Sequence, residues 1–177
     1  MLSAYMLAFC RMVMGIMFAW SFVGKVREGR AFEQTITRFE VLPERWSRLV
    51  AGLVLGGELA VVIAMIIGGP FLAWGFLMGA GMLIVFCCAL ASVLARGLQT
   101  SCGCFGSTDK AVSSMDIVRN LGFVVCAVGG YSTSTITQNS LTVSDTLEWG
   151  LVGLAGLLAM MFVAVWTQVG EINHLFR

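Results

Sequence analysis

The sequence predicts an all-α, polytopic membrane protein, folded as a compact helical bundle with four to five transmembrane helices. Of its 177 residues, 58% are hydrophobic and only 12% are charged, and the mean hydropathy is +0.89. A soluble domain usually contains about 45–50% apolar and about 25% charged residues. A water-soluble chain of this size could not bury so much apolar surface, so the bilayer must act as its solvent.

Five apolar segments are long enough to cross a bilayer, which takes about 20 mostly apolar residues. They cover residues 4–23, 49–69, 71–95, 116–136 and 147–169. The first segment lacks a basic stretch before it and an A-x-A cleavage site, so we interpret it as a retained helix. Because nothing indicates a separate soluble domain, we predict one integral membrane domain over residues 1–177.

The segments between these helices also carry local signals. Phe32, Ile36 and Phe39 recur at helical spacing among charged residues, which predicts a short amphipathic helix on the membrane surface. Gly68-Gly69-Pro70 predicts a tight hairpin between the second and third helices.

Two pairs of glycines are spaced as GxxxG motifs. They are Gly52 with Gly56 and Gly75 with Gly79. Such pairs let helix backbones approach closely, so we interpret both as packing contacts.

Two charged residues, Arg11 and Glu58, fall inside the first and second apolar segments. A charge near the bilayer centre costs a few kcal/mol, so such residues face the bundle interior and usually pair. If the helices run antiparallel from ends at residues 23 and 49, the two residues differ in depth by about 5 Å. We therefore predict an ion pair between them. It is either a strut that sets the helix register or part of a cavity for a quinone, a substrate segment or a proton path.

The stretch TSCGCFGSTD, residues 100–109, places Cys102 and Cys104 in a polar loop, 96–115. A disulfide needs Cα atoms about 4.4–6.8 Å apart, which residues i and i+2 can meet in a bent backbone. Gly103 supplies the backbone freedom for that bend, and Gly103 and Gly106 leave N–H groups free to face a thiolate. Because strained, exposed disulfides are the exchange-competent ones, the pair suits thiol–disulfide exchange.

Two other interpretations of this loop stay open. A site for Cu(I) or Zn(II) could use both thiolates, but it needs further ligands, and His174 is the only histidine, so we predict no metal site. The pair could also be two unreactive loop cysteines. The other four cysteines fall in apolar runs, where packing is the expected role and a thiol relay the alternative. They are Cys10, Cys87, Cys88 and Cys126.

Several stretches together resemble the MauE family, that is, the methylamine-utilisation MauE proteins and their DoxX-like redox-associated relatives. These stretches are GKVREGRAFEQTITRFEVLPE, GELAVV and RG…CGCFG…RN, within residues 11–131. The resemblance implies a multi-pass protein of the bacterial inner membrane that supports disulfide formation or electron transfer beside a thioredoxin-like partner. It also implies a redox pair at Cys102 and Cys104 within CGCFG, which includes Phe105, and an intramembrane acid at Glu58. It does not identify a methylamine-related client, because nothing in this sequence names one.

The leading functional hypothesis is a membrane-embedded thiol–disulfide oxidoreductase that acts on a thioredoxin-like protein or a disulfide-containing client. Two alternatives remain: a non-catalytic membrane scaffold or chaperone for a partner, and a small transporter of a metal or small molecule. The net charge of +1 and the lack of a basic run exclude a nucleic-acid partner.

The charge distribution and the expected chemistry disagree about which side of the membrane the Cys-Gly-Cys loop faces. With five spans, every Lys or Arg outside the apolar segments falls on that loop's side, which the positive-inside rule makes cytoplasmic. Disulfides, in contrast, persist outside the reducing cytosol. The basic residues are Lys25, Arg27, Arg30, Arg38, Arg45, Arg48, Arg96, Lys110 and Arg177.

Overall fold

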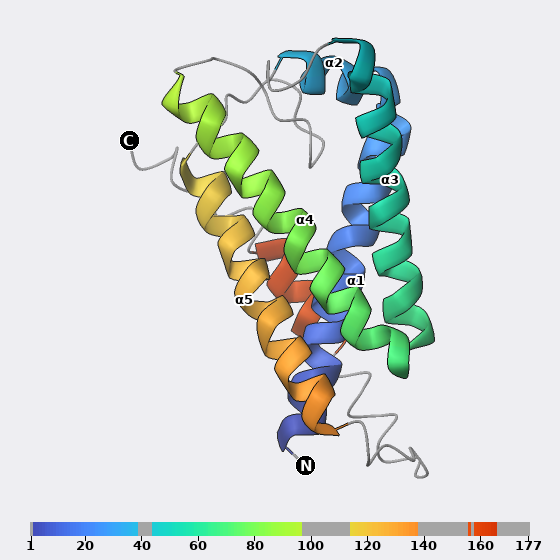
Figure 1. Ribbon diagram of the computed structural model, residues 1–177. Coiled ribbons are helices and arrows are strands. Elements are labelled where there is room, and N and C mark those ends of the chain that lie inside the picture. Colours follow the sequence, from blue (N-terminus) through green and yellow to red (C-terminus); the bar gives the residue numbers. More distant parts are fainter. Residues whose placement is uncertain (1, 39–43, 97–113, 138–155, 157, 166–177) are drawn as a thin grey trace.

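The computed structural model describes residues 2–38, 44–96, 114–137, 156 and 158–165, and nearly all of these residues are helical. The helices are α1 (Leu2–Arg27), α2 (Gly29–Arg38), α3 (Glu44–Ile67), α4 (Pro70–Ala95) and α5 (Ser114–Thr137) (Figure 1). A further helical stretch covers 158–165. The all-α membrane bundle predicted from the sequence is confirmed.

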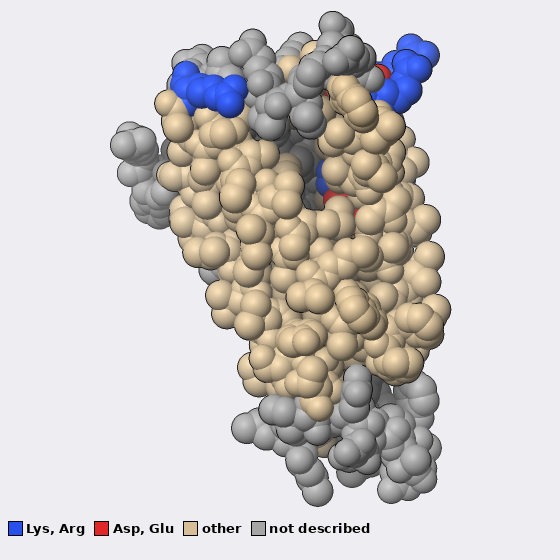
Figure 2. Space-filling view, in the orientation of Figure 1, with Lys and Arg blue, Asp and Glu red and all other residues tan. Residues whose placement is uncertain are grey.

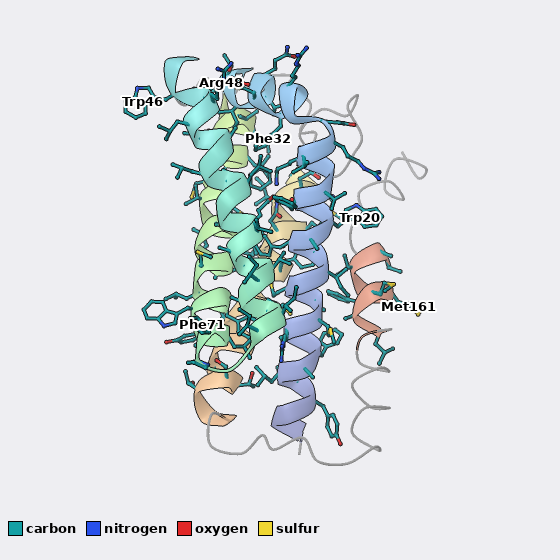
Figure 3. All side chains as sticks on the ribbon, turned by 90° about the vertical axis from the view of Figure 1, so that its right-hand side faces the viewer. Trp20, Phe32, Trp46, Arg48, Phe71 and Met161 are labelled. Atoms are coloured by element: carbon teal, nitrogen blue, oxygen red, sulfur yellow. The ribbon has the colours of Figure 1, made fainter. Side chains whose placement is uncertain are left out.

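Three of the described helices are long and apolar enough to cross a membrane: Tyr5–Arg27, Trp46–Ile67 and Pro70–Ala95. Helix α5 coincides with the fourth expected segment, but among the described residues it is not one of these three candidates. Of the fifth expected segment, 147–169, only 156 and 158–165 are described. Exposed aromatic side chains lie at both ends of the bundle, Trp46 near the start of α3 and Phe71 near the start of α4 (Figure 3). Such positions match the two membrane interfaces.

The predicted hairpin between α3 and α4 is present and depends on its glycines. Gly68 and Gly69 have φ of 74° and 57°, in the left-handed region that other residues rarely adopt. Pro70 then begins α4, where its missing N–H costs no helical hydrogen bond. The two helices are therefore antiparallel and joined at one end of the bundle, which we call the hairpin end.

Helix α2 closes the opposite end of the bundle, which we call the α2 end. It lies across the tops of α1 and α3 (Figure 1). Thr37 Oγ1 is 3.0 Å from Ser47 Oγ, and Arg48 Nε donates to Glu33 Oε1 at 3.3 Å, so polar contacts join α2 to the first turns of α3. This is the short amphipathic helix expected on the membrane surface.

The hairpin end is closely packed, and one GxxxG pair explains why. A Cβ atom placed on Gly75 would lie 2.8 Å from Ala64 Cβ, and one placed on Gly79 would lie 2.9 Å from Met14 Cε. The Gly75–Gly79 packing contact is therefore confirmed. The prediction was wrong for Gly52 and Gly56, because a Cβ at either position meets no described atom within 4 Å.

Candidate functional site

Arg11 and Glu58 do not form the predicted ion pair. Arg11 instead donates from Nε to the Met65 carbonyl oxygen at 2.5 Å and from Nη2 to the Ile66 carbonyl oxygen at 2.8 Å. Those carbonyls belong to the last turn of α3, where the helix itself supplies no partners and a positive charge is favourable. Arg11 therefore caps α3 beside the hairpin.

The prediction was wrong because the two helices have a different register from the one assumed. Gly15 lies opposite Met65, with 3.6 Å between a Cβ placed on Gly15 and Met65 Cβ, and Ser21 lies opposite Glu58. By this register α3 continues about two turns beyond the end of α1. Those extra turns pack against α2. Because Glu58 lies opposite Ser21 in this register, it is far from the level of Arg11 and closer to α2.

The partner of Glu58 is Lys25, which hydropathy had assigned to a loop. Both residues are buried, with 3% and 5% of their surface exposed. Helix α1 continues through Arg27, and helical side chains tilt toward the N-terminus, so Lys25 reaches down the bundle. There its Nζ forms an ion pair with Glu58 Oε1 and donates to Ser21 Oγ at 2.6 Å. Ser21 Oγ in turn donates to the same Oε1 at 3.0 Å.

One oxygen of Glu58 is left without a partner. Oε1 receives both hydrogen bonds, whereas Oε2 is buried and has no hydrogen-bond partner among the described residues. A buried polar atom without a partner costs about 1–3 kcal/mol, and more when the group is charged. Such an atom at a polar cluster inside an apolar bundle is a candidate ligand contact.

This polar cluster lies in the wall of a cavity of about 640 Å³. The cavity occupies the wedge between α3 and α4, which diverge from their hairpin toward the α2 end (Figure 1). Figure 2 shows it as a hollow in a face made mainly of uncharged residues, with a basic and an acidic group inside. Lys25 and Glu58 are the charged residues among the described ones that line it.

Helix α2 and helix α5 complete the cavity. Phe32 points from α2 down between α1 and α3 (Figure 3), and its ring centroid lies 5.4 Å from Lys25 Nζ, a distance that allows a cation–π contact. Asn120 of α5 also lines the cavity; it is 2% exposed and donates from Nδ2 to the Asp116 carbonyl oxygen at 2.9 Å. All five labelled helices therefore contribute to the cavity around Lys25 and Glu58.

The expected redox residues Cys102, Gly103, Cys104, Phe105 and Gly106 lie outside the described residues. The helices that flank them are described. Helix α4 ends at Ala95 and α5 begins at Ser114, both toward the α2 end of the bundle (Figure 1). Residues of these same helices line the cavity one to two turns from those ends, so the chain leaves and re-enters the bundle close to the cavity.

Of the cysteines in apolar segments, Cys10 has the packing role that was expected. It is 3% exposed within the main core, against which Cys126 of α5 also packs. Cys87 is half-buried on α4, and Cys88 is exposed. All four are free thiols.

Sequence reasoning missed Lys25 and Ser21. Their spacing of one helical turn was the available signal, because it places both on one face of α1 if that helix continues past residue 23. Hydropathy ended the helix there, since a run of charged residues follows. A long lysine side chain can, however, reach several ångströms from its Cα and keep its charged end with a polar partner.

Comparison with known proteins gives a consistent result. Residues 3–133 match the family model described as "Methylamine utilisation protein MauE". A relative from Paracoccus denitrificans, "Methylamine utilization protein MauE", is 29% identical over 166 residues, which cover 92% of this chain and 86% of the relative. No solved structure matches the chain. The matched range includes the cavity residues and the Cys-Gly-Cys sequence.

Proposed function

The chain belongs to the methylamine-utilisation MauE family, and from this membership we propose that it is a membrane-embedded thiol–disulfide exchange protein. Cys102 and Cys104 form its reactive pair. It works in the bacterial cytoplasmic membrane on a thioredoxin-like partner or on a client protein that needs disulfides. The relative's printed name makes proteins of methylamine utilisation the first clients to test.

The observation that supports this proposal is the placement of the two helix ends between which the Cys-Gly-Cys sequence falls. Helix α4 ends and α5 begins toward the end of the bundle where the cavity lies. An extended chain spans about 3.3 Å per residue, so the segment 97–113 is long enough to bring the pair to the cavity or to a partner at the membrane surface. The sequence CGC favours a labile disulfide over a permanent one.

The exchange reaction balances without another reactant. A client thiolate attacks one sulfur of the oxidised Cys102–Cys104 disulfide, and a mixed disulfide forms while the other sulfur leaves as a thiolate. The client's second thiolate then attacks the mixed disulfide, which leaves an oxidised client and a reduced Cys102–Cys104 pair. The client loses two electrons and the pair gains them.

The test is oxidation of a reduced thioredoxin by the purified, oxidised protein in lipid nanodiscs. We expect about one thioredoxin disulfide per chain in a single turnover, and its loss in both Cys102→Ser and Cys104→Ser. When the single variants are mixed with oxidised thioredoxin instead, the one that keeps the attacking cysteine should form a mixed disulfide, which a reductant releases. Cys88→Ser is the matched control, because Cys88 is an exposed cysteine of α4. Full activity in both single variants would contradict the proposal and favour a scaffold role.

The side of the membrane is settled by a second measurement. In intact cells, with Cys10, Cys87, Cys88 and Cys126 replaced, a membrane-impermeant maleimide should label the pair only after reduction if it is extracytoplasmic and oxidised. Labelling only after permeabilisation would place it in the cytoplasm, as the basic residues favour. The protein would then carry reducing equivalents from a cytoplasmic thioredoxin into the membrane.

A further inference from the structure

We propose that the cavity between α3 and α4 binds a membrane quinone, whose ring oxygens contact Lys25 and Glu58. This inference deepens the proposed thiol–disulfide function, on which it rests, by naming the electron acceptor that reoxidises the cysteine pair. Binding of a quinone at this cavity has three requirements: access from the lipid, room for the ligand, and a matching polar contact.

Access from the lipid follows from the residues at the rim of the cavity. Leu53 on α3 and Val85 on α4 both line it, and they are 67% and 70% exposed on the bilayer-facing surface. The hollow opens through a face without charged side chains around its mouth (Figure 2). A ligand can therefore enter sideways from the membrane without crossing an aqueous surface, which favours a lipid-soluble molecule.

The size of the cavity fits a ring with the first part of an isoprenoid tail. Its volume of about 640 Å³ lies within the range of about 300–1,000 Å³ usual for small-molecule sites. Among the described residues, the lining combines apolar side chains, such as Phe18, Met82 and Phe86, with one charged pair. Apolar walls with few polar groups are the usual composition of such a site, and the rest of a long tail can remain in the bilayer.

The polar cluster selects a neutral head group over the common lipids. Lys25 and Glu58 compensate each other's charge, so a fatty-acid carboxylate or a phospholipid phosphate would add an unpaired negative charge beside Glu58 Oε2. A quinone adds no charge. Its carbonyl oxygen can accept a hydrogen bond from Lys25 Nζ, and after reduction the hydroxyl can donate to the unpartnered Oε2. The cluster therefore offers a partner for both redox forms.

The redox step balances between the cysteine pair and the quinone. The thiols of Cys102 and Cys104 lose two electrons and two protons as the S–S bond forms. The quinone takes up two electrons and two protons and leaves as the quinol. Both forms are lipid-soluble, so the reduced product can return to the bilayer through the opening by which the oxidised form entered.

The test measures binding of a short-chain ubiquinone to the full chain in nanodiscs by isothermal titration. Gly81→Phe should fill the cavity, because Gly81 lines it and a Cβ there meets no described atom within 4 Å. Gly56→Phe is the matched control, since Gly56 is equally open but does not line the cavity. We expect Gly81→Phe to weaken binding at least about tenfold and Gly56→Phe to change it less than about twofold.

Competition and cysteine variants separate the remaining outcomes. Equal loss of binding in both glycine variants, or displacement of the quinone by equimolar palmitate or phosphatidylglycerol, would overturn the proposal in favour of an ordinary lipid site. The Cys102→Ser/Cys104→Ser double variant should still bind the quinone but should not reduce it when thioredoxin is supplied. Thioredoxin oxidation without quinone binding would disprove the acceptor and leave thiol exchange intact. Quinone binding with inert thiols would disprove thiol exchange, and with it the acceptor role, but would leave the quinone-binding site intact.

Discussion

The hairpin end and the α2 end of the bundle each hold a cation of α1 against α3, yet they use different partners. Arg11 binds backbone carbonyls in the last turn of α3, whereas Lys25 binds the side chain of Glu58. Around Arg11 the helices are close, with glycine at the contacts of α4. Around Lys25, α3 and α4 separate and leave a cavity.

This difference indicates separate roles for the two ends. Backbone carbonyls at a helix terminus are fixed by the fold and cannot change protonation, so Arg11 holds the hairpin in place. A carboxylate with an unpartnered oxygen can accept a ligand or a proton. The hairpin end therefore stabilises the bundle, and the α2 end is the part available for chemistry.

The largest expected effect comes from breaking the pair at the α2 end. Lys25→Ala leaves Glu58 charged and buried without its cation, which typically costs about 3–5 kcal/mol of unfolding free energy. Denaturant unfolding in detergent micelles measures it. The double variant Lys25→Met/Glu58→Gln should lose less than the sum of the single variants, because it removes both charges together. A loss under about 1 kcal/mol in Lys25→Ala would show that Glu58 does not depend on this partner.

A smaller effect is expected at the hairpin end. Arg11→Ala removes charge-assisted hydrogen bonds to Met65 and Ile66 and should cost about 1.5–3 kcal/mol. Quinone binding should stay unchanged in the same variant, because Arg11 does not line the cavity. Arg11→Lys should recover part of the stability through its charge at the helix end. Weaker quinone binding without a loss of stability would contradict the division of roles between the two ends.

The smallest effect is expected from the surface ion pair between α2 and α3. Arg48 is 88% exposed in its side chain, so Arg48→Ala should cost about 0–1 kcal/mol and less at high salt. The salt dependence of the unfolding midpoint checks this. A loss as large as that of Arg11→Ala would mean that this exposed pair, and not burial of the apolar face of α2, holds that helix over the cavity.

Local features of the fold were predictable from the sequence because they depend on neighbouring residues. Apolar runs located α1, α3 and α4, and the spacing of Phe32 and Ile36 located α2. The GxxxG pairs show the limit of such local signals. Gly75 packs against Ala64, but a Cβ placed on Gly52 would have no described atom within 4 Å. Both pairs nevertheless have the same spacing. Spacing places two glycines on one face of a helix, but it does not say which face meets a neighbour.

The candidate site was only partly predictable. Glu58 was identified because a carboxylate in an apolar segment needs a partner, but its partner was assigned to Arg11. The correct choice depends on how far α3 extends past the end of α1. The extra turns of α3 pack against α2, which lies across that end of the bundle. The cavity was expected only as one interpretation of that charged pair, and no residue pattern marks its walls. They come from all five labelled helices, which are far apart in the chain.

By itself, the sequence determined that this protein is an all-α membrane bundle with a buried acid, a glycine hairpin and a Cys-Gly-Cys segment between two helices. These properties follow from composition, backbone freedom and the high cost of a charge in lipid. Only the tertiary structure decided which cation meets Glu58 and where the helices separate. Those outcomes depend on helix register and divergence, which arise from the packing of whole helices and not from the residues of any one of them.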